Sequence, residues 1–444
     1  MELYIADSLE LLLDQLQKQL HRSDPLQGPR ILIPNRNLRR WMQMAIASRH
    51  GVSANLNFQY LEQGISSIFT GVTELRLASP ARQHWALLRA LQNSSADALE
   101  SYRKAAHLSY LFRDYEYHRN PLIRAWQRQL STSPAGNLEP DIFFLEEEFK
   151  FSLEENGYYQ QQQEFYTGML KALHASGSFT FTELACRALE EGKFAPEPLY
   201  VFGLSRMSRL HLSLLFRLSL HFPVQIYLFD VFGTSLGPGG QKNWESVHPP
   251  ELVARKEEDT LFVEHSNLTD QEYSFQRDGL ELLYLFQKGS DFLKQNGASL
   301  NWHRCLEKSD GGILRSKRSS AIRVVEAPNM RREVESIHDD ILLRIKDQSL
   351  APEDFGILVP TMHRYRAHFE YVFNGRNQLP FNLTDFSARE TSRLGDAVRT
   401  LLKFDQPLDR RTVFHLLSNP MIRKKWGFRG DDYQDLLRKV DDLN

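Results

Sequence analysis

Short apolar runs, each about as long as one β-strand, alternate with helical patterns along much of this chain. The runs cover residues 3–6, 30–34, 198–203 and 224–229. After the first run, Ser8 is placed to cap a helix whose leucines form one stripe over residues 9–20. Strands that alternate with helices pair in parallel, so the sequence predicts an α/β fold with a parallel sheet.

A long helical segment interrupts this alternation between the second and third runs. From residue 76 to residue 176 the pattern is helical almost throughout, and Trp85, Leu88, Leu108 and Phe112 recur at helical spacings. We predict that this segment is an inserted helical domain.

A fresh β/α unit begins near residue 320. Apolar runs at 322–326 and 355–359 enclose a helical pattern at 332–345 and predict a second parallel-sheet domain. A chain of 444 residues is also longer than one hydrophobic core sustains. The predicted domains are a first α/β domain at 1–75 and 177–315, a helical insertion at 76–176, and an incomplete second α/β domain at 320–444 that ends at the start of a further helical insertion.

The remaining segments carry weaker signals. The stretch from Gly233 to about Asn267 is rich in Gly, Pro and charged residues, as in a long surface connection. The chain stops in or just after a helical pattern without a stop signal, so we expect a fragment of a longer protein. The start lacks the pattern of a signal peptide, and the apolar runs are much shorter than a membrane span. We therefore expect a cytoplasmic protein that does not enter a membrane.

Composition limits the possible chemistry. The formal net charge is −2, so contact with nucleic acid would have to use local basic patches. Cys186 and Cys305 are the two cysteines, too few for a disulfide framework or an iron–sulfur cluster. His303 and Cys305 lack further ligands nearby in the sequence. We expect no metal site and no cofactor.

Two β/α units around a helical insertion are typical of superfamily-1 helicases, which contain two RecA-like domains. An ATP site of that kind needs a glycine-rich loop with a Lys followed by Ser or Thr. The loop over residues 34–40 has neither, and Gly-Lys-Ser or Gly-Lys-Thr occurs nowhere in the chain. The strand at 201–205 also lacks the carboxylates that would hold magnesium. We predict a lost ATP site, with Pro34, Asn35 and Asn37 at the degenerate loop, and no catalytic residues.

A basic cluster follows that loop. Arg36, Arg39 and Arg40 precede Trp41, and together they could hold DNA phosphates and stack on bases. The alternative is an ordinary solvated helix start with Trp41 in the core.

The helical insertion contains a second mixture of aromatic and basic side chains. Tyr110, Arg113, Tyr117 and Arg119 fall within ten residues, a combination that suits single-strand binding. Since Tyr115 and its apolar neighbours are expected to face the core, we favour Arg113, Tyr117 and Arg119 as contacts. An amphipathic helix without a ligand explains the pattern equally simply.

One short pattern resembles that of magnesium-dependent nucleases. Pro140-Asp141 is followed by Glu148 and Lys150, but that chemistry needs carboxylates fixed on adjoining strands. The glutamates here continue into a helical pattern, so we do not favour a nuclease.

Several stretches, in order along almost the whole chain, resemble the RecC family. They are Arg40–Met44, Gly51–Phe58, Val201–Ser205, Arg332–Asp339 and Leu379–Phe381. The resemblance implies a helicase fold without ATP-site residues, acting as a DNA-binding and scaffolding subunit of a RecBCD-like helicase–nuclease in double-strand break repair. Its implied partners are the 3′ single strand and duplex end of DNA, a RecB-like helicase–nuclease subunit and a RecD-like helicase subunit.

Some members of the family also read a regulatory DNA sequence, Chi, with their first domain. The matching positions here are Pro34, Arg36, Arg40, Tyr60, Ser66, Tyr110, Arg113 and Arg119. Of these, Arg119 alone retains the family residue. Because phosphate contacts position DNA whereas base contacts specify its sequence, we expect general single-strand binding or a different regulatory sequence.

Two other functions remain open from the sequence. One is a protein-interaction scaffold of the same complex that does not touch DNA, which the near-neutral net charge allows. The other is an active helicase or nuclease, against which the missing phosphate loop argues.

Overall fold

The computed structural model divides the chain into two compact units, Met1–Asp310 and Gly311–Asn444. The structure describes residues 1–6, 8–20, 28–92, 98–127, 144–145, 157–204, 206–229, 252–257, 260–265, 270–305, 324–348, 350–375, 377–384, 392–402, 410–427 and 430–441. The three-domain division predicted from the sequence stays a prediction.

The first unit contains a six-stranded parallel sheet with the order β10-β1-β7-β6-β2-β3. The strands are β1 (Glu2–Ala6), β2 (Arg30–Ile33), β3 (Asn57–Tyr60), β6 (Leu199–Phe202), β7 (Val224–Phe229) and β10 (Asn301–Arg304). The four predicted strands are the four inner ones, which confirms an α/β fold with a mostly parallel sheet. The edge strands β3 and β10 were not predicted.

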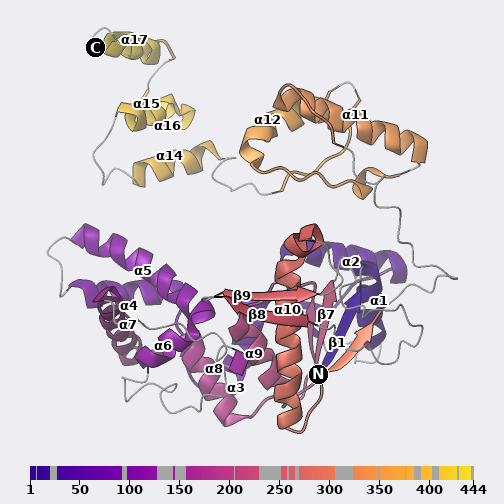
Figure 1. The fold of residues 1–444 in the computed structure, drawn as a ribbon. Coiled ribbons are helices and arrows are strands. Elements are labelled where there is room, and N and C mark those ends of the chain that lie inside the picture. The colour runs from indigo at the N-terminus through magenta and orange to yellow at the C-terminus, as the bar shows by residue number, and fades with distance from the viewer. Residues whose placement is uncertain are drawn as a thin grey trace. The chain divides into compact units, whose positions relative to one another are not determined.

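Helices cover both faces of this sheet. On one face, α1 (Leu9–Leu20) and α2 (Arg36–His50) pack on strand residues such as Tyr4 and Ile31. On the other face lie α3 (Leu61–Val72), α8 (Phe181–Glu191), α9 (Arg209–Leu218) and α10 (Asp270–Gln295). Because successive strand residues point to opposite faces, Leu3 and Leu32 belong to this second core. Figure 1 shows α1 and α2 on one side of the strands and α9 and α10 on the other.

The helical segment between residues 77 and 178 has a core of its own. Its helices are α4 (Pro80–Gln92), α5 (Ala98–His118), α6 (Asn120–Gln127) and α7 (Gly157–Ala175) (Figure 1). Leu87, Phe112, Trp126 and Tyr166 meet in that core. A short parallel pair, β4 (Arg76–Leu77) with β5 (Ser178–Phe179), joins the two ends of the segment.

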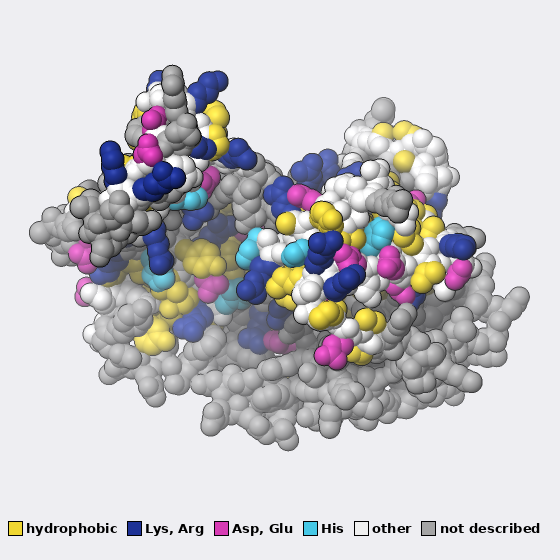
Figure 2. Space-filling model, turned by 90° about the horizontal axis from the view of Figure 1, so that it is seen from above, with side chains coloured by type: hydrophobic (Ala, Val, Ile, Leu, Met, Phe, Trp, Pro, Cys, Tyr) yellow, Lys and Arg dark blue, Asp and Glu magenta, His cyan; other side chains and the backbone are white. Residues whose placement is uncertain are grey.

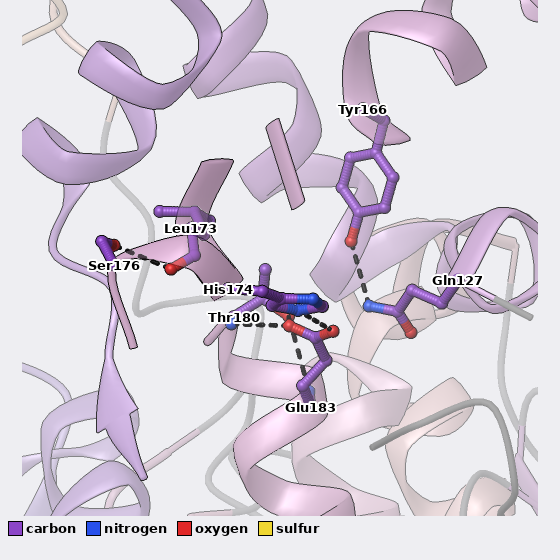
Figure 3. A network of polar contacts seen from close by, with 7 residues as sticks. All are labelled: Gln127, Tyr166, Leu173, His174, Ser176, Thr180 and Glu183. Atoms are coloured by element: carbon purple, nitrogen blue, oxygen red, sulfur yellow. Dashed lines mark hydrogen bonds and ion pairs between the residues drawn. The ribbon is translucent and has the colours of Figure 1, made fainter. Parts of the chain in front are cut away.

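A buried polar network fixes the junction between this segment and the sheet helices (Figure 3). Thr180 and Glu183 form a capping box at the start of α8, with the Thr180 N–H donating to Glu183 Oε2 at 3.0 Å. The other carboxylate oxygen lies 2.8 Å from Nε2 of His174 in α7. In α6, Gln127 donates to the phenol oxygen of Tyr166 at 3.0 Å. The charge of Glu183 therefore has partners even though its side chain is buried.

Part of the predicted surface connection is folded. Strands β8 (Leu252–Glu257) and β9 (Thr260–His265) form an antiparallel hairpin before α10. The connection predicted from Gly233 to about Asn267 was therefore wrong over these residues, because charged residues can alternate in a hairpin as well as in a loop. The beginning of that segment lies outside the described residues.

In the second unit, the described residues contain helices but no strand. The helices are α11 (Met330–Gln348), the 3₁₀ turn η4 (Pro352–Asp354), α12 (Met362–Phe373), α14 (Arg393–Leu402), α15 (Arg410–Ser418), α16 (Pro420–Trp426) and α17 (Gly430–Asp441). Val334, Phe369 and Phe373 form its main core.

The sequence predicted strands at 322–326 and 355–359, and the structure forms no strand at the described residues of these segments. Residues 322 and 323 lie outside the described part, and the rest pairs with no described strand. A strand needs a hydrogen-bonded neighbour as well as an apolar pattern. Without one, Val324 is 90% exposed and Leu358 is 99% exposed.

Across the described parts of both units, no helix is long and apolar enough to cross a membrane. Within the same residues, no cluster of His, Cys, Asp and Glu could hold a metal ion.

Candidate nucleic-acid interface

The loop between β2 and α2 lies at the carboxyl end of the sheet, where ligands of open α/β folds usually bind. Asn35 caps α2, and its side-chain oxygen accepts a hydrogen bond from the N–H of Leu38 at 2.9 Å. This cap occupies a helix N-terminal donor that a phosphate would need. Pro34 is exposed in the same loop, and Asn37 is exposed in the first turn of α2.

The neighbouring strand β6 ends without a carboxylate. Gly203 follows it with φ +70°, and the next residue, Leu204, is buried in the core. A Cβ on Gly203 would lie 2.6 Å from Cδ2 of Leu38. The glycine thus lets the end of β6 pack closely against the first turn of α2. An ATP site of the helicase type would need a magnesium ligand at this position.

The three predicted arginines of α2 are exposed. Among the described residues, no carboxylate pairs with Arg36 or Arg40. Arg39 lies over the ring of Phe58, 5.8 Å from its centroid. Trp41 is half-buried against the core beneath α1 and α2, so stacking by its indole has less support than phosphate contact by the arginines.

Tyr60 joins this surface through the register of the sheet. Strand β3 pairs with β2 so that Tyr60 lies beside Ile33, one residue before the loop. Its side chain is exposed. Aromatic and cationic groups therefore share one edge of the sheet, a combination that suits a single strand.

The second predicted group lies on α5. It contacts the same edge through Glu62, which was not predicted as a site residue. Glu62 stands in the first turn of α3, two residues after Tyr60. Nη2 of Arg113 donates to both carboxylate oxygens of Glu62, at 2.9 Å each. In the sequence, Glu62 could be recognised only as a carboxylate in the first turn of a helix. Its pairing with Arg113 could not be predicted, because the two residues are 51 positions apart.

The other α5 candidates differ in their access to a ligand. Tyr117 stacks on His211 with ring centroids 5.0 Å apart, and burial followed by the Glu62 carboxylate raises the pKa of its phenol. Arg119 lies over the ring of Tyr115 and also donates to the hydroxyl of Tyr159 at 3.5 Å. Tyr110 is 76% exposed. Tyr110 is thus freely available, whereas Arg113 and Tyr117 engage their own chain.

Charge on the described surface is mixed. Figure 2 shows Lys and Arg side chains interspersed with Asp, Glu and hydrophobic side chains over one face. Binding would therefore depend on local clusters, as the net charge of −2 already indicated. The nuclease-like residues Asp141, Glu148 and Lys150 lie outside the described residues.

Comparison with known proteins gives consistent matches. Residues 1–315 match the model of the RecC N-terminal domain. RecBCD enzyme subunit RecC of Haemophilus influenzae is 21% identical, over 95% of this chain and 44% of its own length. The same subunit from Escherichia coli is 20% identical, over 95% of this chain and 42% of its own length. The chain thus spans less than half the length of these curated relatives.

Proposed function

Because the chain belongs to the RecC family, we propose that it is the N-terminal part of a DNA-binding and scaffolding subunit of a RecBCD-like complex. The observation that carries the DNA-binding role is the exposed edge formed by Arg36, Arg39, Arg40 and Tyr60. Exposed guanidinium groups beside an exposed ring can hold phosphates and stack on a base. On this proposal the edge guides the 3′ single strand during double-strand break repair.

The proposed subunit is non-catalytic, and the helicase-like fold of its first unit has lost its ATP site. Asn35 occupies the helix donor, and Gly203 and Leu204 stand where a carboxylate would be needed. Movement along DNA would then come from motors in partner chains, a RecB-like helicase–nuclease and a RecD-like helicase. A cytoplasmic location belongs to the same proposal.

Strand recognition is proposed to depend little on sequence. Arg36 and Arg40 present guanidinium groups that favour phosphates, and Tyr60 presents a ring that any base can stack on. A regulatory sequence, if one is scanned, should differ from that of the relatives. Selective binding of the Chi octamer over a scrambled strand would contradict this.

The test is fluorescence anisotropy of a 3′-tailed duplex titrated with the full chain at several salt concentrations. The variant changes Arg36, Arg39 and Arg40 to Ala. A control of equal charge changes Arg187, Arg344 and Arg366, which pair with carboxylates elsewhere. We expect binding that weakens with salt, and a slope of log K against log salt that falls by about 2 in the variant alone.

Equal slopes for the two variants would remove this edge from the DNA path. Absence of binding at low salt would instead favour the second candidate, a scaffold without DNA contact. That candidate is supported by the near-neutral charge and by an exposed aliphatic face on α14, formed by Leu394, Val398, Leu401 and Leu402. An active helicase or nuclease is the least supported function.

A further inference from the structure

An exposed aromatic cluster lies between α4 and α5. Trp85 is 58% exposed and Tyr102 is 47% exposed. The two rings lie 6.4 Å apart, and His84 contacts both, 5.8 Å from Trp85 and 4.6 Å from Tyr102. Edge-on contacts of this kind hold the rings in fixed positions.

Packing of the helices does not require these rings. Leu87, Leu88 and Leu91 supply the buried stripe of α4, and Trp85 lies outside that stripe. A large aromatic side chain that stays exposed forgoes the gain from burial. Grouped exposed rings therefore point to a ligand that covers them.

The charges around the cluster suit an anionic ligand. Residues 80–92 contain Arg82 and Arg89 and no acidic residue. Arg89 lies one turn after Trp85 and is exposed. On α5, Arg103, His107 and Tyr110 follow at spacings of four and three residues, and all three are exposed. Glu100 is the acidic residue in the first three turns of α5.

We propose that Trp85 and Tyr102 form a base-stacking site for single-stranded nucleic acid, with Arg89 and the row of Arg103, His107 and Tyr110 following the backbone. The inference rests on the proposed function and adds a contact surface to it. The composition favours nucleic acid over a protein partner: three of the four large hydrophobic side chains exposed on these two helices are aromatic, whereas those exposed on α14 are aliphatic. Every base has a face on which such rings can stack.

The experiment titrates the full chain with an oligothymidylate strand and follows both anisotropy and tryptophan fluorescence. The variants are Trp85→Ala, Tyr102→Ala and Trp85→Phe, and Trp426→Ala is the control because Trp426 is also exposed but lies on α16. We expect about tenfold weaker binding for Trp85→Ala, with partial recovery in Trp85→Phe. The salt slope should stay unchanged, because stacking releases no counterions.

Quenching of fluorescence on binding should also disappear in Trp85→Ala and persist in Trp426→Ala. Thermal unfolding of each variant verifies the fold, which loss of an exposed ring should leave intact. Wild-type affinity in Trp85→Ala would overturn this inference and leave the proposed function standing, and the cluster would then suit a protein. No binding by the unaltered chain would overturn both.

Discussion

Gly203 is subject to two constraints that can be measured separately. Its φ of +70° disfavours any side chain, and an added Cβ would lie 2.6 Å from Leu38. Gly51, at the end of α2, has φ +78° and nothing within 4 Å of an added Cβ. We predict that Gly51→Ala lowers the free energy of unfolding by about 1 kcal/mol, and Gly203→Ala by about 2 to 4 kcal/mol. Urea denaturation checks both, and equal losses would show that the Leu38 contact yields at no cost.

Glu116 of α5 is fully buried, and burial raises the pKa of its carboxyl to about 8. The native chain therefore keeps this proton between about pH 4.5 and pH 8, whereas the unfolded chain releases it. Stability must fall as the pH rises through this window. Glu116→Gln removes the titrating carboxyl. Relative to wild type, the free energy of unfolding of the variant should therefore rise by on the order of 3 kcal/mol between pH 4.5 and pH 8. Denaturation at several pH values checks this, with Glu100→Gln, exposed on the same helix, as control. A constant difference across the window would contradict it.

His211 should affect the stability of the fold at acidic pH. Burial lowers the pKa of its imidazole to about 4, so the ring is neutral in the native state and protonated in the unfolded state between about pH 4 and pH 6.5. Stability is therefore lost as the pH falls through this interval. His211 also stacks on Tyr117, so acid should loosen the α5–α9 contact.

Among the secondary structure elements, the inner strands could be predicted and the outer ones could not. Strands β1, β2, β6 and β7 are covered on both faces, which requires the apolar runs seen in the sequence. Strands β3 and β10 form the edges, and polar residues such as Asn57 and Asn301 are tolerated there. The segment at 355–359 has the opposite property, an apolar pattern without a described partner strand. Pairing depends on distant residues, so a local pattern does not specify it.

The candidate site could also be predicted only where it depends on local sequence. Arg36, Arg39 and Arg40 follow one another in sequence, and their exposure on α2 follows from a helix that must bury Met42 and Ile46. The pairing of Arg113 with Glu62 joins α5 to α3 and could not be predicted from spacing. The sequence also did not predict that Trp85 is exposed while the leucines beside it are buried.

The contact between α3 and α5 leads to a prediction about DNA binding. Glu62 neutralises Arg113 and places a negative charge two residues from Tyr60. Glu62→Gln should release the guanidinium group toward a phosphate and strengthen single-strand binding about threefold. Arg113→Gln should weaken binding by a similar factor, because it leaves the Glu62 carboxylate unpaired beside Tyr60. Anisotropy at low salt compares both variants with the double variant, in which the gain should vanish. Weaker binding by Glu62→Gln would show that the ion pair positions the edge.

The first unit closes its sheet with residues from its two ends, and this should decide which fragments fold. Strand β10 pairs with β1 from Asn301 to Arg304, and the N–H of Cys305 donates to the carbonyl of Ile5 at 2.9 Å. A fragment of residues 1–310 retains every strand of this sheet and the cores on both of its faces. We predict that it unfolds in one transition, within a few degrees of the first unit in the full chain.

A fragment of residues 1–298 lacks β10, leaves one side of β1 unpaired and removes Leu300 and Trp302 from the core. Loss of two buried side chains and a strand should lower its stability by several kcal/mol, on the order of 5, and the exposed strand edge should promote association. Circular dichroism on heating and sedimentation compare the two fragments. If both unfold alike as monomers, β10 is an accessory strand. If the longer fragment fails to fold, the first unit depends on residues beyond 310.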